Sequence, residues 1–303
     1  MIRPRMLPAR MYVLARSLPG SPSMSLWLPV ALALLVAPAP AYAQLRPLPP
    51  FDWRSFETDR VVTIQTGTGI YAGQRASLAG TEGLLVEAGE VEAYWRQGRV
   101  VIELGGTALR IFHDEHRFAP PQRDVDDPDA GRRTDAGDLR IGTAIRVSPR
   151  HWPADLALRF GTRLPTTDNR VGLERDQTDF YATIAAAVTT GRLRLSGETG
   201  VGIWGTRIED FEQADVLLYA LGAEYRAGPV AAAVLLVGQA DGFDGWEIRG
   251  NENLREARLA LLIGQRRWLR AELVRGLAPF SPDTGVRLSA GIAAGGPRHP
   301  PAP

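Results

Sequence analysis

The sequence predicts an all-β protein: a single transmembrane, antiparallel, up-and-down β-barrel of about 12 strands. Three observations support this prediction: apolar and polar residues alternate along segments of about 11 residues, short and long links alternate between those segments, and the chain begins with an export signal. No run of about 18 apolar residues follows that signal, so the sequence predicts no membrane-spanning helix in the mature chain.

Composition excludes several kinds of chemistry. The 303 residues include no Cys, and all 35 residues counted as Lys or Arg are Arg. A disulfide scaffold, a thiolate metal site and a cysteine nucleophile are therefore excluded, as is any reaction that depends on a lysine amine. With 23% charged and 45% hydrophobic residues, the chain has the composition of a folded protein rather than of a disordered one.

Residues 1–43 have the pattern of a cleaved secretory signal peptide. Four Arg precede an apolar stretch at 26–36, and a small-residue cleavage site at 41–43 lies just before Gln44. These residues hold no acid, so losing their four Arg changes the formal net charge from +1 to −3, which indicates no nucleic-acid partner. After the signal we expect a Pro-rich periplasmic lead-in at 44–60, the barrel at 61–294 and a flexible Gly/Pro tail at 295–303.

Period-two alternation is clearest at 139–147, where apolar residues or Thr occupy odd positions and Arg or small residues occupy even ones. A strand of about 11 residues tilted by about 45° crosses the hydrocarbon layer. Twelve segments have this length and pattern: 61–71, 83–95, 99–112, 138–148, 154–164, 178–188, 192–204, 215–226, 230–240, 255–265, 268–277 and 285–294. Segment 230–240 is the weakest, because both of its faces are mostly apolar.

The links between these segments alternate in length, as in outer-membrane barrels, which have short periplasmic turns and long outer loops. Short links are expected at 96–98, 148–153, 189–191, 227–229 and 265–267, and longer ones at 72–82, 113–137, 165–177, 205–214, 241–254 and 278–284. Because lipid offers no partner to backbone N–H and C=O groups, the sheet must close on itself.

Aromatic residues on the apolar face lie near the predicted strand ends. Trp95 and Tyr225 are expected in a periplasmic girdle, and Phe112 and Phe180 in an outer one. We therefore expect the protein in the outer membrane of a diderm bacterium, in contact with lipid and inserted by the barrel-assembly machinery. The alternative, a soluble lipocalin-like barrel or β-sandwich, would have about eight strands with the apolar face turned inward.

The opposite face is rich in charged residues and is expected to line the lumen. Arg slightly outnumbers acid on it, which favours a narrow, weakly anion-selective pore; a lumen filled by cross-strand salt bridges, without conduction, remains the alternative. The candidate lumen-lining residues are Arg140, Arg146, Arg159, Arg163, Arg192, Arg194, Glu198, Glu224, Arg258, Arg270 and Glu272.

Two other kinds of site are weighed and not expected. The acidic loop at 124–131 could suit calcium, but it lacks the downstream Glu that such a site requires, so neither a metal nor another cofactor is expected. A lipid hydrolase would need a Ser beside a His; His113 and His116 lie at the mouth of a long link, and no strand Ser is placed beside them. The sequence therefore predicts no enzyme.

The run Arg163-Leu164-Pro165-Thr166-Thr167-Asp168, followed by Gly172-Leu173 and Thr178-Asp179-Phe180, resembles a strand–loop–strand element of the outer-membrane family of phenol-degradation meta-pathway transporters. Thr167 stands where that family usually has Gly, and Glu174-Arg175-Asp176 stands where a second Gly is usual. The resemblance covers residues 160–180 and implies a transport barrel for small, aromatic or hydrophobic compounds.

Three functions follow from these observations. The first is an outer-membrane channel or transport barrel for small aromatic, hydrophobic or anionic solutes. The second is a structural or adhesive barrel without conduction, in which the loops at 113–137 and 241–254 are the functional part. The third, an outer-membrane lipid hydrolase, depends on His113 and His116.

Overall fold

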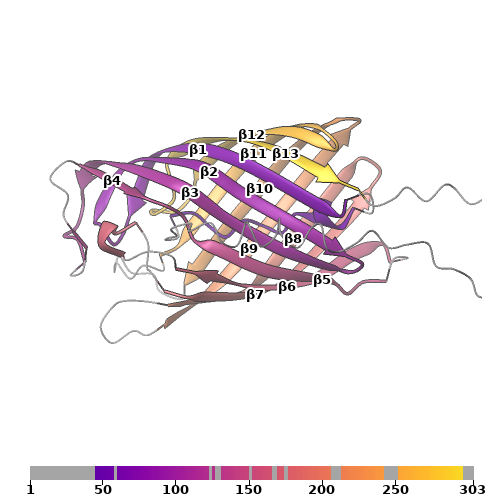
Figure 1. Ribbon diagram of the computed structural model, residues 1–303, viewed down its shortest axis with the longest axis horizontal. Coiled ribbons are helices and arrows are strands. Elements are labelled where there is room, and N and C mark those ends of the chain that lie inside the picture. Colours follow the sequence, from indigo (N-terminus) through magenta and orange to yellow (C-terminus); the bar gives the residue numbers. More distant parts are fainter. Residues whose placement is uncertain are drawn as a thin grey trace, which may run out of the picture. The chain divides into compact units, whose positions relative to one another are not determined.

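The computed structural model describes residues 45–57, 60–122, 125–126, 131–149, 152–165, 169–173, 177–205, 213–241 and 252–295. They form one closed antiparallel β-barrel, which confirms the predicted fold (Figure 1). The sheet has 13 strands, of which 12 form the ring, because β4 (Arg132–Asp135) pairs with β3 (Val100–Arg117) alone. The predicted signal at 1–43 and residues 296–303 of the predicted tail lie outside the described residues.

The ring closes where the last strand pairs with the first, from Val62 opposite Ala294 to Ala72 opposite Thr284. Among the described residues, no helix is both long and apolar enough to cross a membrane. The strands are β1 (Val62–Ala76), β2 (Thr81–Gln97), β3 (Val100–Arg117), β4 (Arg132–Asp135), β5 (Leu139–Arg146), β6 (Ala154–Leu164), β7 (Asp179–Thr190), β8 (Leu193–Gly205), β9 (Gln213–Ala227), β10 (Val230–Asp241), β11 (Leu254–Gly264), β12 (Arg267–Gly276) and β13 (Thr284–Ala294).

The predicted rhythm of links holds, with two corrections. The long link expected at 113–137 contains the end of β3, which runs to Arg117, and the short strand β4. β1, β2 and β3 have 15, 17 and 18 residues, more than predicted, and the link expected at 72–82 is a turn at 77–80. β1 and β2 continue beyond the predicted segments because the ladder between them extends to Ala76 opposite Thr81. Below, the short-turn end is the end of the barrel that carries the turns at 98–99, 191–192, 228–229 and 265–266, and the opposite end is the long-connection end.

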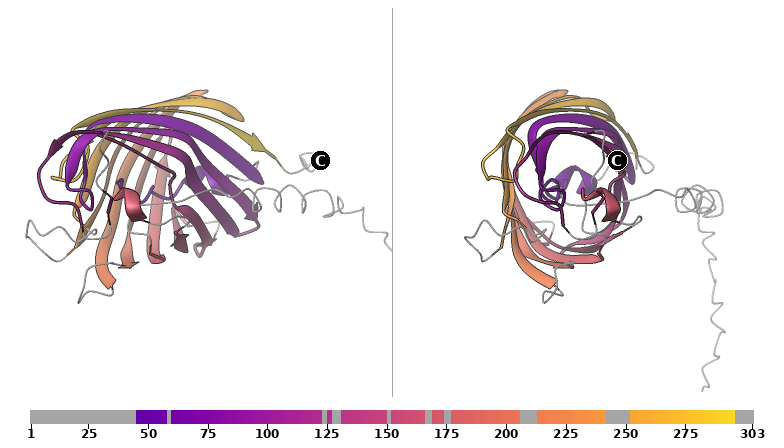
Figure 2. Two further views of the ribbon diagram at one scale, coloured as in Figure 1. Left: turned by 60° about the vertical axis from the view of Figure 1, so that its left-hand side comes forward. Right: turned by 90° about the vertical axis from the view of Figure 1, so that its left-hand side faces the viewer.

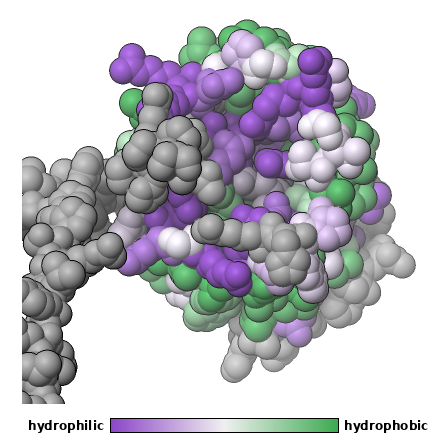
Figure 3. Space-filling view, turned by 90° about the vertical axis from the view of Figure 1, so that its right-hand side faces the viewer, coloured by the Kyte–Doolittle hydropathy of each residue, from purple (hydrophilic) through white to green (hydrophobic). Residues whose placement is uncertain are grey.

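Alternation along the strands produces an apolar outer surface. The outward side chains include Leu221, Val234 and Leu269, which are 60%, 59% and 66% exposed. Their neighbours along each strand turn inward, and the inward set includes buried ions such as Arg159, Glu103 and Glu272. Seen from the short-turn end, hydrophilic residues lie at the centre and hydrophobic ones on the flanks (Figure 3).

An irregularity in the ladder of β2 and β3 overturns one girdle assignment. Between the pairs Glu90–Thr107 and Ala88–Leu109, both strands carry one unpaired residue, namely Gly89, with a φ of +66°, and Ala108. Against β1, Gly89 is an extra residue, because Glu90 and Ala88 are opposite the consecutive residues Gly67 and Thr68. On β3 the buried positions change parity across Ala108, from Glu103 before it to Arg110 after it. Phe112, predicted on the outer girdle, is consequently fully buried inside the barrel.

Glycines on the inner wall make room for aromatic rings. Gly142 and Gly161 face each other on β5 and β6, and the ring of Tyr181 on β7 lies over both. A Cβ atom at Gly161 would lie 2.4 Å from the Tyr181 hydroxyl oxygen and 2.5 Å from the carbonyl oxygen of Ile141. Because the second of these atoms is backbone, the wall has no simple way to relax.

We expect Gly161→Ala to lower the free energy of unfolding by about 1–3 kcal/mol, the usual cost of overpacking. Gly197→Ala is the matched control, since its Cβ would lie 3.5 Å from Leu221 Cδ2, an ordinary contact. Urea unfolding of both variants in lipid vesicles measures the difference, and equal midpoints would contradict the tight approach of Tyr181.

Candidate functional site: a lumen occupied by the N-terminal segment

Residues 45–57, the luminal segment, lie inside the barrel (Figure 2). The sequence interpretation placed them in a periplasmic lead-in outside the strands. The structure differs because the apolar side chains of the segment find partners on the inner wall. Leu45, Leu48, Phe51, Trp53 and Phe56 are all at most 8% exposed.

The luminal segment runs through the lumen from one end to the other. Leu45 packs with Phe112 and Leu173 at the long-connection end, and Leu48 packs with Trp204 and Leu218 further along. The guanidinium of Arg60, just after the segment, donates to the carbonyl of Gln265 in a short turn. The chain then enters β1 and returns along the wall.

Proline content suits this extended path. Pro47, Pro49 and Pro50 have no backbone N–H and restrict φ to extended values, so the crossing exposes few donors that would need partners. One remaining donor, the Phe51 N–H, reaches Glu198 Oε2 at 2.7 Å. Arg159 Nη1 in turn donates to the Pro49 carbonyl at 3.0 Å. The wall thus binds the backbone of the segment through two charged side chains.

The aromatic part of the luminal segment occupies a seat lined with small residues. Phe51, Trp53 and Phe56 pack together, with 5.1 Å between the ring centroids of Phe51 and Trp53. The wall beneath them contributes Tyr94 and Val101. It also contributes four alanines on β5, β6 and β7, namely Ala144, Ala157, Ala185 and Ala187. Larger side chains on those inward positions would fill the volume that the rings occupy.

A 3-10 helix, Trp53–Phe56, ends the luminal segment and is stabilised by its own cap. The Asp52 carboxylate accepts from the Arg54 backbone N–H at 3.0 Å and from Arg54 Nε and Nη2, each at 2.9 Å. Burial raises the pKa of Asp52, but the charge and hydrogen bonds of Arg54 outweigh it and lower that pKa to about 2. Asp52 is therefore a carboxylate at every physiological pH.

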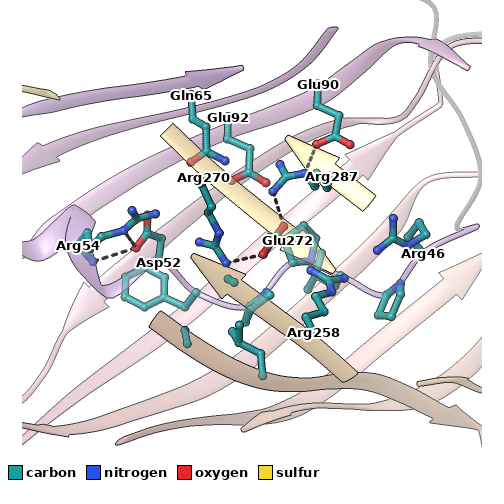
Figure 4. Close-up of a pocket in the computed structure, with 18 of the residues that line it drawn as sticks. Arg46, Asp52, Arg54, Gln65, Glu90, Glu92, Arg258, Arg270, Glu272 and Arg287 are labelled. Atoms are coloured by element: carbon teal, nitrogen blue, oxygen red, sulfur yellow. Dashed lines mark hydrogen bonds and ion pairs between the residues drawn. The ribbon is translucent and has the colours of Figure 1, made fainter. Parts of the chain in front are cut away.

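Ions of the wall pair with each other around the segment. Arg159 Nη2 and Nη1 reach Glu103 at 2.8 Å and Glu198 at 3.0 Å, and all three side chains are buried. Figure 4 shows a second group, in which Arg287 joins Glu90 to Glu272, and Arg270 meets Glu272 at 2.5 Å. Such pairing is what makes a charged interior tolerable, because an isolated buried ion is very costly.

A cavity of about 220 Å³ remains beside the luminal segment. Of the predicted lumen residues, seven line it: Arg140, Arg163, Arg194, Glu224, Arg258, Arg270 and Glu272. Arg159 and Glu198 lie where they bind the segment, and Arg146 pairs with Asp155. Arg192 is a correction: β8 begins at Leu193, so Arg192 lies exposed in the turn before it.

One wall of this cavity is apolar, which the sequence interpretation did not foresee. Ala231, Ala233 and Leu235 of β10 and Ala260 and Leu262 of β11 line it. Their signal was present in the weak segment at 230–240, where no polar face could be found. The lumen therefore combines an apolar strip with paired ions.

The three remaining girdle residues lie on the outer surface. Trp95 and Tyr225, toward the short-turn end, are 50% and 51% exposed, and Phe180, at the other end of β7, is 55% exposed. His113 and His116 lie exposed near the end of β3. Among the described residues, no group of three or more His, Cys, Asp or Glu could hold a metal. Most of the acidic loop at 124–131 lies outside them.

The element at 160–180 forms a strand, a loop and a strand. Arg163 Nη2 meets Asp179 Oδ2 at 2.5 Å where β6 faces β7, and Leu173 packs in the apolar cluster around Leu45. A short 3-10 helix, Asn169–Val171, lies between the strands. Residues 166–168 and 174–176, which include the turn of the proposed family motif, lie outside the described residues.

No protein family and no curated protein matches the sequence. Among solved structures, the chain is similar to the COG4313 outer membrane channel from Pseudomonas putida F1, with a TM-score of 0.55, 14% identity, and coverage of 81% of this chain and 99% of that one. The NanC porin scores 0.48 at 7% identity, covering 76% of this chain and 98% of that one. The CymD monoaromatic hydrocarbon channel scores 0.42 at 10% identity, covering 81% and 91%. The first of these likenesses shows a shared barrel fold.

Enlarging the alanine seat is expected to displace the luminal segment. Because the chain has no Cys, Ser55→Cys supplies a single thiol at a position that is 2% exposed. In that background, Ala185→Leu should raise the rate of thiol labelling by roughly tenfold or more, since overpacking costs about 1–3 kcal/mol. Ala182→Leu, on the outward face of the same strand, is the control, and equal labelling in both would argue against the seat.

The pKa of Asp52 sets the acid limit of this arrangement. A lowered pKa stabilises the folded turn above the unfolded value of about 3.9, and that contribution is lost as the pH falls through about 2. Hydrogen exchange at residues 53–56, corrected for the intrinsic rate, should therefore stay slow down to about pH 4. Asp52→Asn should be faster at neutral pH. Protection lost well above pH 4 would contradict the lowered pKa.

Proposed function

We propose that the protein is an outer-membrane channel for small solutes, closed by its own luminal segment and opened when that segment moves. The observation that carries the proposal is that residues of the N-terminal chain, rather than long side chains of the wall alone, fill the lumen. If the lumen only had to be filled, large side chains on the wall would be enough. The wall instead has small alanines beneath the aromatic cluster of the luminal segment.

The outer surface supports the membrane location. Exposed Leu, Ile and Val side chains lie on 11 of the 12 ring strands, all except β5, while charged side chains gather inside. An Arg facing lipid at the midplane costs about 2–4 kcal/mol, which explains the segregation. We place the short turns in the periplasm and the long connections outside, with insertion by the barrel-assembly machinery after signal cleavage.

The contacts of the luminal segment suit reversible closure. They are hydrogen bonds, ion pairs and packed rings, and the described part of the segment is continuous with the barrel only through β1. After the proposed cleavage before Gln44, the segment is attached at one end and can leave the lumen without any strand moving. The rest of the wall keeps its own ion pairs when this happens, as with Arg287 between Glu90 and Glu272.

Solutes that are small and partly apolar fit this lumen best. The cavity holds about 220 Å³ and places the apolar strip of β10 and β11 opposite paired ions. The similar barrel from Pseudomonas putida is described as an outer membrane channel, which agrees with the proposal. Aromatic compounds with a charged or polar group combine the required features.

A structural barrel without conduction is the second candidate. The specific observation in its favour is how many ion pairs the wall residues form, since Arg159 alone binds Glu103, Glu198 and a segment carbonyl. Under this alternative, the luminal segment would be a permanent core. The two candidates differ in what happens when the segment is removed.

Deleting residues 45–56 should raise single-channel conductance in planar bilayers several-fold, because the segment occupies the length of the lumen. Ala185→Leu reaches the same state without a deletion and should give frequent openings, whereas Ala182→Leu should behave as the parent protein. Liposome swelling with aromatic acids and with sugars of similar size then measures solute preference. Silent bilayers from folded preparations of both displaced forms would favour the structural barrel.

A further inference from the structure

Arg46, near the start of the luminal segment, occupies a site built by three wall residues. Its Nη2 donates to Glu256 Oε2 at 2.7 Å, and its Nε contacts the other oxygen of that carboxylate. Nη1 lies 3.9 Å from Glu87 Oε2, and the guanidinium carbon lies 3.7 Å from the centroid of the Tyr71 ring. A fork of donors on a carboxylate, with an aromatic face beneath, is a complete guanidinium site.

All three wall residues are buried. The Glu256 side chain has no exposed surface, Tyr71 is 0% exposed and the Glu87 side chain is 5% exposed. They come from β11, β1 and β2, so they are fixed by the barrel and not by the segment. Arg46, Tyr71 and Glu87 also line the cavity, so a solute that reaches this cavity is next to the site.

Departure of Arg46 would leave the site short of one positive charge. Glu256 would keep Arg258, whose Nε and Nη2 are each 2.8 Å from Oε2, but its other oxygen would lose the hydrogen bond from Arg46 Nε. Glu87 would keep Arg110 at 2.6 Å. Because a buried carboxylate without a full set of partners is unfavourable, opening is opposed unless another cation enters.

The other segment arginine differs in the location of its carboxylate. Arg54 lies over the Trp268 ring at 5.4 Å, but its carboxylate partner is Asp52, which belongs to the segment itself. When the segment moves out of the lumen, Arg54 and Asp52 move together and stay paired. Of these two arginines, Arg46 is the one whose carboxylate partner, Glu256, stays on the wall when the segment leaves.

We propose that the Arg46 site, formed by Tyr71, Glu87 and Glu256, recognises a guanidinium or alkylammonium group of the transported solute, and that Arg46 is an internal substitute for that group. The inference rests on the proposed function and names a feature of its solute. A cationic solute that replaces Arg46 removes the electrostatic penalty of opening, so its binding and the release of the segment favour each other.

The first test is chemical rescue of binding, which does not depend on conduction. Arg46→Ala should lower the thermal unfolding midpoint by roughly 5 °C, the order expected for a disrupted buried pair in a chain of this size. Millimolar methylguanidinium should restore most of this loss with saturation, whereas sodium at equal ionic strength should not. Arg54→Ala is the matched control and should not be rescued, because its carboxylate is on the segment.

Glu256→Gln tests the wall side of the site. In combination with Arg46→Ala it should abolish the rescue, because the amide removes the charge that holds the cation. If methylguanidinium stabilises Arg46→Ala and the combined variant equally, or stabilises neither, the proposed site is overturned.

The second test is competition in a chain that retains Arg46. With a single thiol from Leu48→Cys, which is 8% exposed as Leu, methylguanidinium should accelerate labelling several-fold in a saturable way, and Glu256→Gln should remove the saturable part. If methylguanidinium rescues Arg46→Ala but the displaced forms do not conduct in planar bilayers, the proposed cation site is supported and the channel function is overturned. Conductance of the deleted form without rescue or competition would keep the channel and overturn the site.

Discussion

Pairing of buried charge is the constraint on which the rest of this structure depends. A closed barrel with an apolar exterior has only its interior for ionisable side chains, and there each ion needs a partner. Arg159 illustrates the result: its side chain is 1% exposed, and its guanidinium binds two carboxylates and a carbonyl at once. The same demand extends to the luminal segment, which supplies Arg46 to Glu256 and an N–H to Glu198. Fold and occupant therefore share one electrostatic network.

Sequence patterning predicted the barrel well because strand alternation and lipid exposure are local properties. Each outward residue of β6 or β8 faces lipid, so the alternation of apolar and polar residues can be recognised in each strand separately, without knowing which strands lie beside it. Phe112 escaped this reasoning because a single unpaired residue upstream, at Ala108 opposite Gly89, reverses the inward parity. A bulge of this kind depends on two strands together, so neither strand alone reveals it.

The inserted segment could not be predicted by the same means. Residues 45–57 have neither alternation nor helical period, and their partners lie on strands that are up to about two hundred residues away, as with Arg46 and Glu256. A weaker signal was present on the wall. Alanines at 144, 157, 185 and 187 are small for a face that otherwise carries Arg and Glu, and such a cluster indicates that another part of the molecule fills the space. The apolar inward face of β10 conveyed the same information about the cavity.

The direction of the luminal segment also constrains the order of assembly. Leu45 lies among the long connections and the chain re-emerges near Gln265 before turning into β1, so the segment lies antiparallel to the first strand, inside the ring that β1 and β13 close. Threading such a chain after closure requires a short leading end. Under the proposed orientation, that end starts in the periplasm and must travel toward the cell surface, so a bulky leader still attached ahead of it would block the passage. Seating after closure would therefore require prior cleavage of the leader, whereas a segment whose leader is still attached can be enclosed only if β1 and β13 pair last, around an occupant already in place.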